Sequence, residues 1–148
     1  MFPIRPLEKR DYPQLLSLFM EFSAFQKKAD EMKNSVESME EESDLLNAFV
    51  VETDSGQIIG YATYFYAYFT WSGKSLYMDD LYVKPDFRGK GLGKKLLNSI
   101  IDLAKQEKCK KIHWQVARWN ANAIEFYQNL GAEVDDMELN CDYWLIKR

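Results

Sequence analysis

The first quarter of the chain carries one apolar stripe with a helical period. Its members lie three or four residues apart: Leu15, Leu18, Phe19, Phe22 and Phe25. Asp11 offers a side-chain acceptor for an N-cap, Gln14 stands in capping-box spacing, and Pro13 falls in the first turn. The pattern predicts a helix that begins at Asp11 and packs its stripe against a sheet or another helix.

Flanking this helix, two weaker patterns predict further elements. The short apolar start at Phe2–Pro6 favours a first strand. The acidic stretch up to Asp44 lacks Gly and Pro and has Ser38 and Glu41 in capping-box spacing. We therefore expect a second short helix that ends near Asn47.

The middle of the chain is rich in β-branched and aromatic residues. Ala48–Glu52 and Gln57–Phe69 flank the turn cluster Thr53–Gly56, which predicts a hairpin with a long second strand. That strand is too aromatic to be fully solvated and should line a core or a cleft. A second turn at Trp71–Lys74 returns the chain as a strand over Ser75–Val83.

The second half of the chain alternates helical and extended patterns. Glycines punctuate residues 88–93, and a helical period follows from Leu92. Lys111–Val116 is expected as a strand, Ala121–Leu130 as a helix, and Ala132–Val134 with Tyr143–Ile146 as a closing pair of strands. This order predicts an α/β (α+β) fold, a mixed sheet with helices on its faces, in a single domain over residues 1–148.

Composition narrows the class of protein. With 148 residues, 47% hydrophobic and 28% charged, the chain suits one soluble globular domain. No apolar run approaches a membrane span and no signal-peptide pattern opens the chain, so we expect a cytoplasmic protein that does not bind membranes. Cys109, Cys141 and the single His113 form no CxxC pair or zinc pattern, which disfavours a disulfide framework and a metal site.

Charge is unevenly distributed along the chain. The net charge of −4 disfavours a nucleic-acid partner. Between Asp30 and Asp44, seven acids face one lysine, a local charge of −6, whereas five basic residues face one acid between Lys84 and Lys95, a local charge of +4. Such a field suits an anionic ligand at the glycines and a cationic ligand elsewhere, although each segment also fits a solvated face.

The segment Arg88-Gly89-Lys90-Gly91-Leu92-Gly93 carries the most specific chemistry. Glycines at a strand-to-helix turn expose successive backbone N–H groups, which form an anion-binding nest at the helix N-terminus where a pyrophosphate fits. The spacing matches neither the P-loop nor the dinucleotide fingerprint. A simple tight turn is the alternative, but three glycines and four cationic residues exceed what a turn requires.

Two motifs resemble those of the GNAT superfamily of acyl-CoA-dependent N-acyltransferases. Arg88-x-x-Gly91-x-Gly93 after the strand Leu81–Val83 is similar to its (Arg/Gln)-x-x-Gly-x-(Gly/Ala) motif, and Asn120–Gly131 is similar to Asn-x-x-Ala-x-x-x-Tyr-x-x-x-Gly. The resemblance covers Ile4 to Lys147 and implies a mostly antiparallel central sheet with helices on both faces. Trp71–Tyr77, Met78–Val83 and Trp119-Asn120 resemble the diamine (spermidine/spermine) acetyltransferase branch and its thialysine-acetylating relatives.

The resemblance also implies a cofactor site. Acetyl-CoA is expected between two splayed strands, with its pantetheine paired to the backbone around Leu81, Tyr82 and Val83. The cofactor-binding residues that it implies are Leu81, Tyr82, Val83, Arg88, Gly89, Lys90, Gly91, Leu92, Gly93, Lys94, Asn120 and Tyr127, with the diphosphate on 88–94. Asn120 equally suits a helix cap.

Acetyl transfer to an amine needs a base, since an alkylammonium with a pKa near ~10.4 is protonated at neutral pH. Asp79 and Asp80 are the candidates; strand alternation places them on opposite faces, and a bulge there would change which one faces the acceptor. Tyr127 is the expected proton donor to the leaving CoA thiolate. Trp71 and the acidic pair are expected to bind the acceptor, Trp71 by cation–π contact.

The predicted acceptor is a small cationic amine such as a polyamine, a diamine or a lysine-like amino acid, acetylated directly. Two alternatives remain at this point: a protein lysine or N-terminal acetyltransferase, and an acyl-CoA-binding regulatory module without turnover. The resemblance further implies a homodimer.

Overall fold

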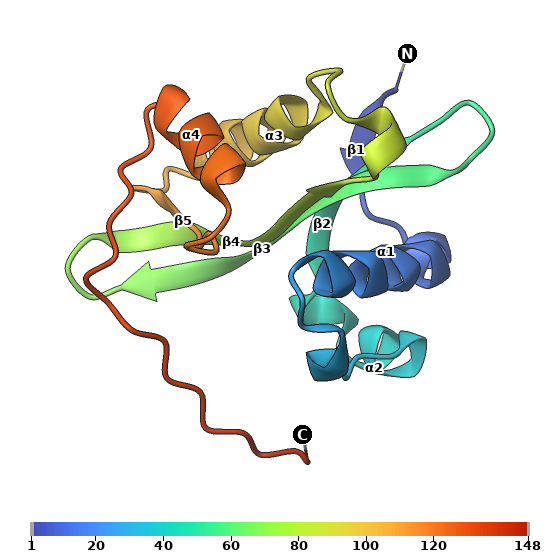
Figure 1. The fold of residues 1–148 in the computed structure, drawn as a ribbon, viewed down its shortest axis with the longest axis horizontal. Coiled ribbons are helices and arrows are strands. Elements are labelled where there is room, and N and C mark those ends of the chain that lie inside the picture. Colours follow the sequence, from blue (N-terminus) through green and yellow to red (C-terminus); the bar gives the residue numbers. More distant parts are fainter. Residues whose placement is uncertain (1, 148) are drawn as a thin grey trace. The chain divides into compact units, whose positions relative to one another are not determined.

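A computed structural model describes residues 2–147 and divides the chain into two compact units, one up to Trp114 and one from Gln115 on. The first unit is built on a five-stranded sheet in the order β1-β2-β3-β4-β5 (Figure 1). Its strands are β1 (Ile4–Pro6), β2 (Asn47–Glu52), β3 (Ile58–Phe69), β4 (Gly73–Val83) and β5 (Ile112–His113). Successive strands from β1 to β4 pair antiparallel, and β5 pairs parallel to β4. The predicted mixed, mostly antiparallel sheet is confirmed.

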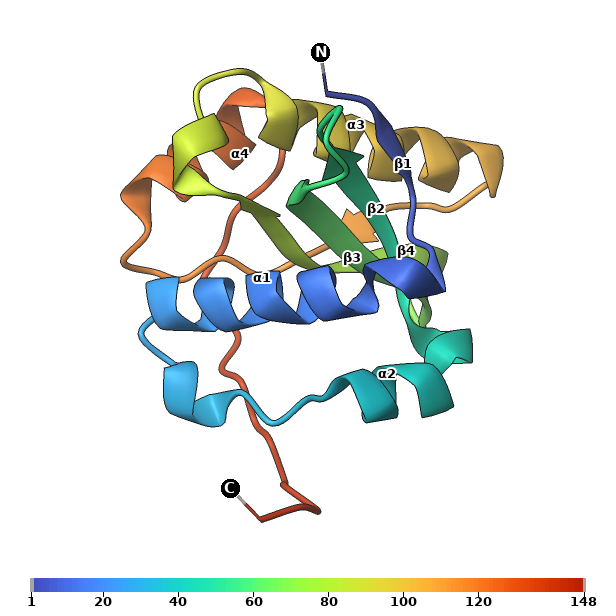
Figure 2. The same ribbon diagram turned by 90° about the vertical axis from the view of Figure 1, so that its right-hand side faces the viewer.

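Helices cover both faces of this sheet (Figure 2), as predicted. The long ones are α1 (Tyr12–Phe25) and α3 (Leu92–Gln106), and α2 (Val36–Glu41) lies beside α1. Single 3₁₀ turns occur at Lys9–Asp11, Ala29–Glu31, Ser43–Leu45 and Pro85–Phe87. None of the helices within residues 2–147 is long and apolar enough to span a membrane.

The α1 face of the sheet holds a continuous apolar core. Leu15 and Leu18 of the predicted stripe are buried there with Val50, Tyr61 and Tyr82 of the strands. Phe19 and Phe22 pack against this cluster, but the last residue of the stripe, Phe25, keeps 41% of its surface in contact with solvent. The predicted packing of the helix on a sheet is therefore confirmed for all but its C-terminal end.

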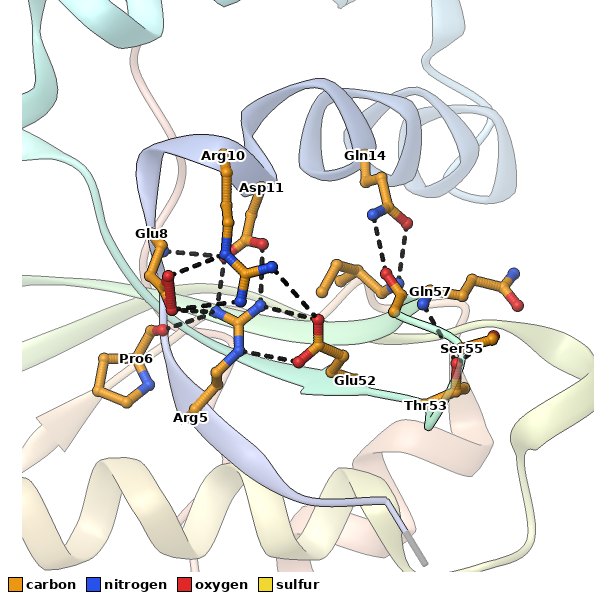
Figure 3. Close-up of polar contacts among 12 residues, drawn as sticks. Arg5, Pro6, Glu8, Arg10, Asp11, Gln14, Glu52, Thr53, Ser55 and Gln57 are labelled. Atoms are coloured by element: carbon orange, nitrogen blue, oxygen red, sulfur yellow. Dashed lines mark hydrogen bonds and ion pairs between the residues drawn. The ribbon is translucent and has the colours of Figure 1, made fainter.

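The beginning of α1 differs from the predicted capping box. Asp11 is buried, and its carboxylate accepts hydrogen bonds from the Glu8 N–H and from two nitrogens of Arg5 at 2.7 and 2.9 Å (Figure 3). Glu52 binds the same guanidinium from β2. The Arg5 pairing holds the pKa of Asp11 below its ordinary value. An unpaired buried carboxylate costs more free energy than an uncapped helix end, so the Asp11 carboxylate pairs with Arg5 instead of capping α1. Through Arg5, Asp11 links the start of α1 to β1 and β2.

Gln14 also has a different role from the predicted one. Its amide donates to the Gly56 carbonyl at 3.1 Å and accepts from the Ile58 N–H at 2.9 Å (Figure 3). These bonds fix the turn between β2 and β3 against α1. The second helix begins and ends earlier than the spacing of Ser38 and Glu41 predicts. Ser35 caps α2 by accepting from the Ser38 N–H, and the helix ends at Glu41 rather than near Asn47.

The second unit contains α4 (Ala121–Asn129), which confirms the predicted helix. The predicted strand Lys111–Val116 contracts to the two residues of β5. The predicted closing strands at 132–134 and 143–146 are wrong, because the described residues after α4 contain no strand. The residues from 133 to 147 are exposed, so a strand there would neither bury an apolar face nor pair its backbone with a neighbour.

Candidate active site

A bulge in β4 sets the position of the acidic pair. Thr63 of β3 pairs with Asp80, but the next residue, Tyr64, pairs with Met78. Asp79 is therefore the extra residue of the bulge, and the simple alternation of side chains breaks at that point. Asp80 lies on the α1 face with Tyr61 and Tyr82, whereas the exposed Asp79 is displaced from the ladder.

Asp80 has an unusual environment for a carboxyl group. Its Oδ2 accepts a hydrogen bond from the buried Tyr61 hydroxyl at 2.9 Å, and its N–H donates to Thr63 Oγ1 at 3.0 Å. Burial, with a smaller contribution from the charge of Asp79, raises the pKa of Asp80 to about 7, while the Tyr61 hydrogen bond opposes this rise. Although the Asp79 side chain reaches solvent, the surrounding protein atoms reduce its hydration and raise its pKa as well. Asp80 can therefore exchange a proton near neutral pH.

One edge of β4 is open beyond the bulge. Among the described residues, β5 pairs with β4 only at Leu76 and Tyr77. The Lys84 N–H bonds to the Ile59 carbonyl on the β3 side, so by alternation the backbone groups of Leu81 and the Val83 N–H point to the open edge. This geometry fits the predicted pairing of a pantetheine with the backbone here.

The glycine turn is shaped by backbone conformation rather than by crowding. Gly89 and Gly91 have φ of 80° and 78°, and a Cβ at either position would meet nothing within 4 Å. Gly91 is the left-handed N-cap of α3. Helix geometry leaves the N–H groups of the first turn, Leu92 to Lys94, without acceptors in the helix, and Lys90 and Lys94 are exposed beside them. The turn thus supplies backbone donors and two cations to an anion.

The remaining predicted residues lie apart from the acidic pair or in the second unit. Trp71 is fully exposed at the β3–β4 turn. Asp80 is the seventh residue after Gly73 along β4, so Trp71, at the turn before Gly73, lies roughly 20 Å from Asp80 along the hairpin. In the second unit, Asn120 caps α4 by accepting from the Ala123 N–H at 3.2 Å, and Tyr127 is buried.

Sequence reasoning missed two partners of the site. Tyr61 and Thr63 contact Asp80 from the neighbouring strand. Both belong to the aromatic strand over Gln57–Phe69, which the sequence predicts to line a core or a cleft. Which of its residues lie beside Asp80 depends on the register between β3 and β4, and the sequence does not give that register. No group of three or more metal-ligating side chains capable of holding a metal ion occurs among residues 2–147.

Comparison with known proteins defines the class to which this site belongs. Residues 7–132 match the family model described as Acetyltransferase (GNAT) family. The chain belongs to this family, which uses acetyl-CoA as cosubstrate, and is an acetyl-CoA-dependent N-acetyltransferase, as the two motifs indicated.

Similar proteins indicate the branch of the family to which the chain is related. A thialysine N-epsilon-acetyltransferase of Bos taurus is 30% identical over 141 residues, which cover 88% of this chain and 83% of the relative. A spermine/spermidine N(1)-acetyltransferase of Bacillus subtilis is 30% identical over 97 residues, 62% of this chain and 64% of the relative. The crystal structure of an aminoglycoside acetyltransferase from a soil metagenome superposes with a TM-score of 0.80 at 20% identity, covering 98% and 97% of the two chains, and shows the same fold. The similarity to the diamine and thialysine branch is confirmed.

Proposed function

We propose that this enzyme transfers the acetyl group of acetyl-CoA directly to the amine of a small cationic acceptor, namely a polyamine, a diamine or a lysine-like amino acid. The observation that carries the proposal is the acidic pair at the β4 bulge, with Asp80 titrating near neutral pH beside an open strand edge. The names of the thialysine and spermine/spermidine acetyltransferases to which the chain is similar support a basic amine as acceptor.

Asp80 acts as the general base in this proposal, and Asp79 attracts the acceptor's positive charge. Proton transfer from an alkylammonium of pKa about 10.4 to a carboxylate of pKa about 7 is uphill by roughly 4 to 5 kcal/mol. A turnover of about 10 per second corresponds to a barrier near 16 kcal/mol, so this step fits within an ordinary enzymatic barrier.

The free amine then attacks the thioester carbonyl, the C–N bond forms and the C–S bond breaks. Backbone N–H groups at the open edge near Leu81 suit the developing oxyanion. The cofactor lies along Leu81 to Val83, with its diphosphate on the turn from Arg88 to Lys94. Tyr127 protonates the leaving CoA thiolate, the proton that the nitrogen loses as the amide forms restores the Tyr127 hydroxyl, and Asp80 releases its proton to solvent. Tyr127→Phe should therefore lower kcat about 100-fold or more while CoA binding persists, measured by steady-state kinetics and calorimetry; an unchanged kcat would remove this role.

Release of CoA over a panel of amines tests the function. The panel contains spermidine, spermine, putrescine, thialysine, lysine, an aminoglycoside and a basic peptide. Turnover of a polyamine or thialysine is expected. Turnover of the peptide alone would favour a protein acetyltransferase, and tight acetyl-CoA binding without any turnover would favour a regulatory module.

We also propose that residues 1–148 act as one catalytic domain in a cytoplasmic homodimer. The family match runs continuously across the boundary between the two units, which supports a single domain. Both cysteines are free, which is typical of a protein in the reducing cytoplasm. Apolar side chains exposed in the second unit support self-association: Val134, Met137, Leu139, Tyr143 and Leu145. Light scattering after size-exclusion chromatography should give twice the mass of one chain.

A further inference from the structure

The last turn of α1 contacts the segment that joins β4 to the glycine turn. Glu21 accepts a hydrogen bond from the Tyr82 hydroxyl at 3.2 Å and pairs with the Lys84 ammonium at 2.6 Å. Phe22 stacks on the Tyr82 ring with 5.1 Å between centroids. The residues on both sides of Val83 are thereby tied to α1.

Arg88, the first residue of the glycine motif, is also held by α1. Its Nε donates to the Val83 carbonyl at 2.8 Å, so the side chain folds back toward the strand end. Its guanidinium carbon lies 5.1 Å from the Phe25 ring centroid and 5.4 Å from that of Tyr82. Both distances are within the range of cation–π attraction.

These contacts explain an otherwise unexplained feature of α1. Phe25 ends the apolar stripe yet remains 41% exposed, so burial in the core does not account for it. Its ring faces Arg88 and also stacks on Phe22 at 6.4 Å. The end of α1 thus supplies one aromatic surface that receives the guanidinium.

The glycine turn benefits from such an anchor. Gly89 and Gly91 adopt positive φ, and an added Cβ at either position would meet nothing within 4 Å, so no side-chain packing fixes the turn at these positions. Ordering a flexible backbone costs conformational entropy, and that cost would otherwise reduce the affinity for a ligand. A turn ordered before binding avoids that cost.

We propose that Phe25 and Glu21 are positioning residues for acetyl-CoA, which hold the glycine turn through Arg88, Lys84 and Tyr82 in the conformation that receives the diphosphate. This inference rests on the proposed function, in which the turn binds that group. Neither residue touches the reacting atoms, so their effect is confined to cofactor affinity.

Phe25→Leu tests the proposal, because leucine keeps an apolar side chain and removes the aromatic face. Calorimetry should show CoA binding weakened about threefold to tenfold, with pantetheine, which lacks the diphosphate, bound as in the wild type. The KM for acetyl-CoA should rise while kcat at saturation stays constant. Phe25→Tyr should restore affinity, and Met20→Leu, an exposed position on the same helix, should change nothing.

Glu21→Gln provides an independent arm. It preserves the shape and the acceptor for Tyr82 but removes the charge that pairs with Lys84, so CoA affinity should fall in the same direction. Equal loss of CoA and pantetheine affinity in the Phe25 and Glu21 variants, or no loss in either, would overturn the positioning role.

A further variant separates this inference from the proposed function. Lys90→Ala combined with Lys94→Ala removes the two cations that flank the turn. If this double variant weakens CoA binding and Phe25→Leu does not, the diphosphate site stands and the positioning role is wrong. If the double variant and Phe25→Leu both bind CoA normally, the diphosphate site is wrong as well.

Discussion

Burial and the charge of Asp79 raise the pKa of Asp80, the hydrogen bond from Tyr61 opposes that rise, and Tyr61→Phe isolates this opposing contribution. The Tyr61 hydroxyl donates to Asp80 Oδ2 at 2.9 Å and favours the charged carboxylate. A hydrogen bond to a charged group contributes about 1.5 to 3 kcal/mol. Because one pKa unit corresponds to about 1.36 kcal/mol, removal of the hydroxyl should raise the pKa of Asp80 by roughly one to two units above its value of about 7.

The kinetic consequence follows from the fraction of Asp80 that is ionised. At pH 7 that fraction is about one half in the wild type and about one tenth after a one-unit rise, so activity falls roughly fivefold. The deficit should shrink toward pH 9, where both forms are largely ionised. The acid limb of the pH–rate profile therefore moves to higher pH. CoA release with a polyamine acceptor, measured from pH 5.5 to 9.5, gives this profile.

A direct titration distinguishes the effect of Tyr61 on the pKa of Asp80 from the role of Asp80 as the base. Carboxyl ¹³C NMR follows the pKa of Asp80 itself, and Tyr68→Phe, at an exposed position of the same strand, serves as control. An Asp80 pKa that stays fixed or falls in Tyr61→Phe would refute the hydrogen-bond argument. A pKa that rises without movement of the acid limb would remove Asp80 as the base.

Three further changes test stability. Asp80→Asn should raise the free energy of unfolding by about 2 kcal/mol at pH 8. This is about half of the free energy that corresponds to a pKa shift from 3.8 to about 7, because solvent screens the partly exposed carboxyl group. The gain should vanish below about pH 4, and urea denaturation at several pH values measures it. Arg5→Ala leaves the buried carboxylate of Asp11 without its cation and should cost about 3 kcal/mol at pH 7. Because Arg5 lowers the pKa of Asp11, this loss should narrow as the pH falls below about 4, and a pH-independent loss would contradict the pairing. Gly91→Ala should cost about 1 to 2 kcal/mol because φ is positive, whereas Gly93→Ala, in open space with ordinary φ, should leave the thermal midpoint unchanged or higher.

The central elements of the fold could be predicted because local pattern and burial agree there. The stripe from Leu15 to Phe22 and the long aromatic strand lie where their periods place them. The errors fall where a partner outside the local pattern overrides a local rule. Asp11 and Gln14 have the spacing of a capping box, but their side chains bind other groups: Asp11 binds the half-buried Arg5 six residues upstream, and Gln14 binds the carbonyl of Gly56 in the distant β2–β3 turn. The C-terminal alternation fails because no neighbouring strand in the described residues pairs with it.

The candidate site shows the same division. The glycine turn is local, and its spacing alone predicts positive φ at its glycines and a helix directly after it, as found. The acidic pair is local in sequence, but its geometry depends on the register of β3 and β4. A bulge adds one residue to one strand only, and no pattern in residues 78–83 announces it. For that reason alternation alone does not decide which of Asp79 and Asp80 lies on the α1 face, and the hydroxyl of Tyr61 is not identified in advance.

The bulge, the tyrosine and the second carboxyl together argue that this point of the sheet is maintained for chemistry rather than for stability. A half-buried Asp80 that titrates near pH 7 destabilises the folded state at every pH above its ordinary range. An asparagine would keep an acceptor for Tyr61 without that penalty. A fold optimised for stability alone would favour that change. The stability assay on Asp80→Asn, paired with its activity, tests this directly: a more stable and inactive variant is expected, and a more stable variant with full activity would leave the acidic pair without a function.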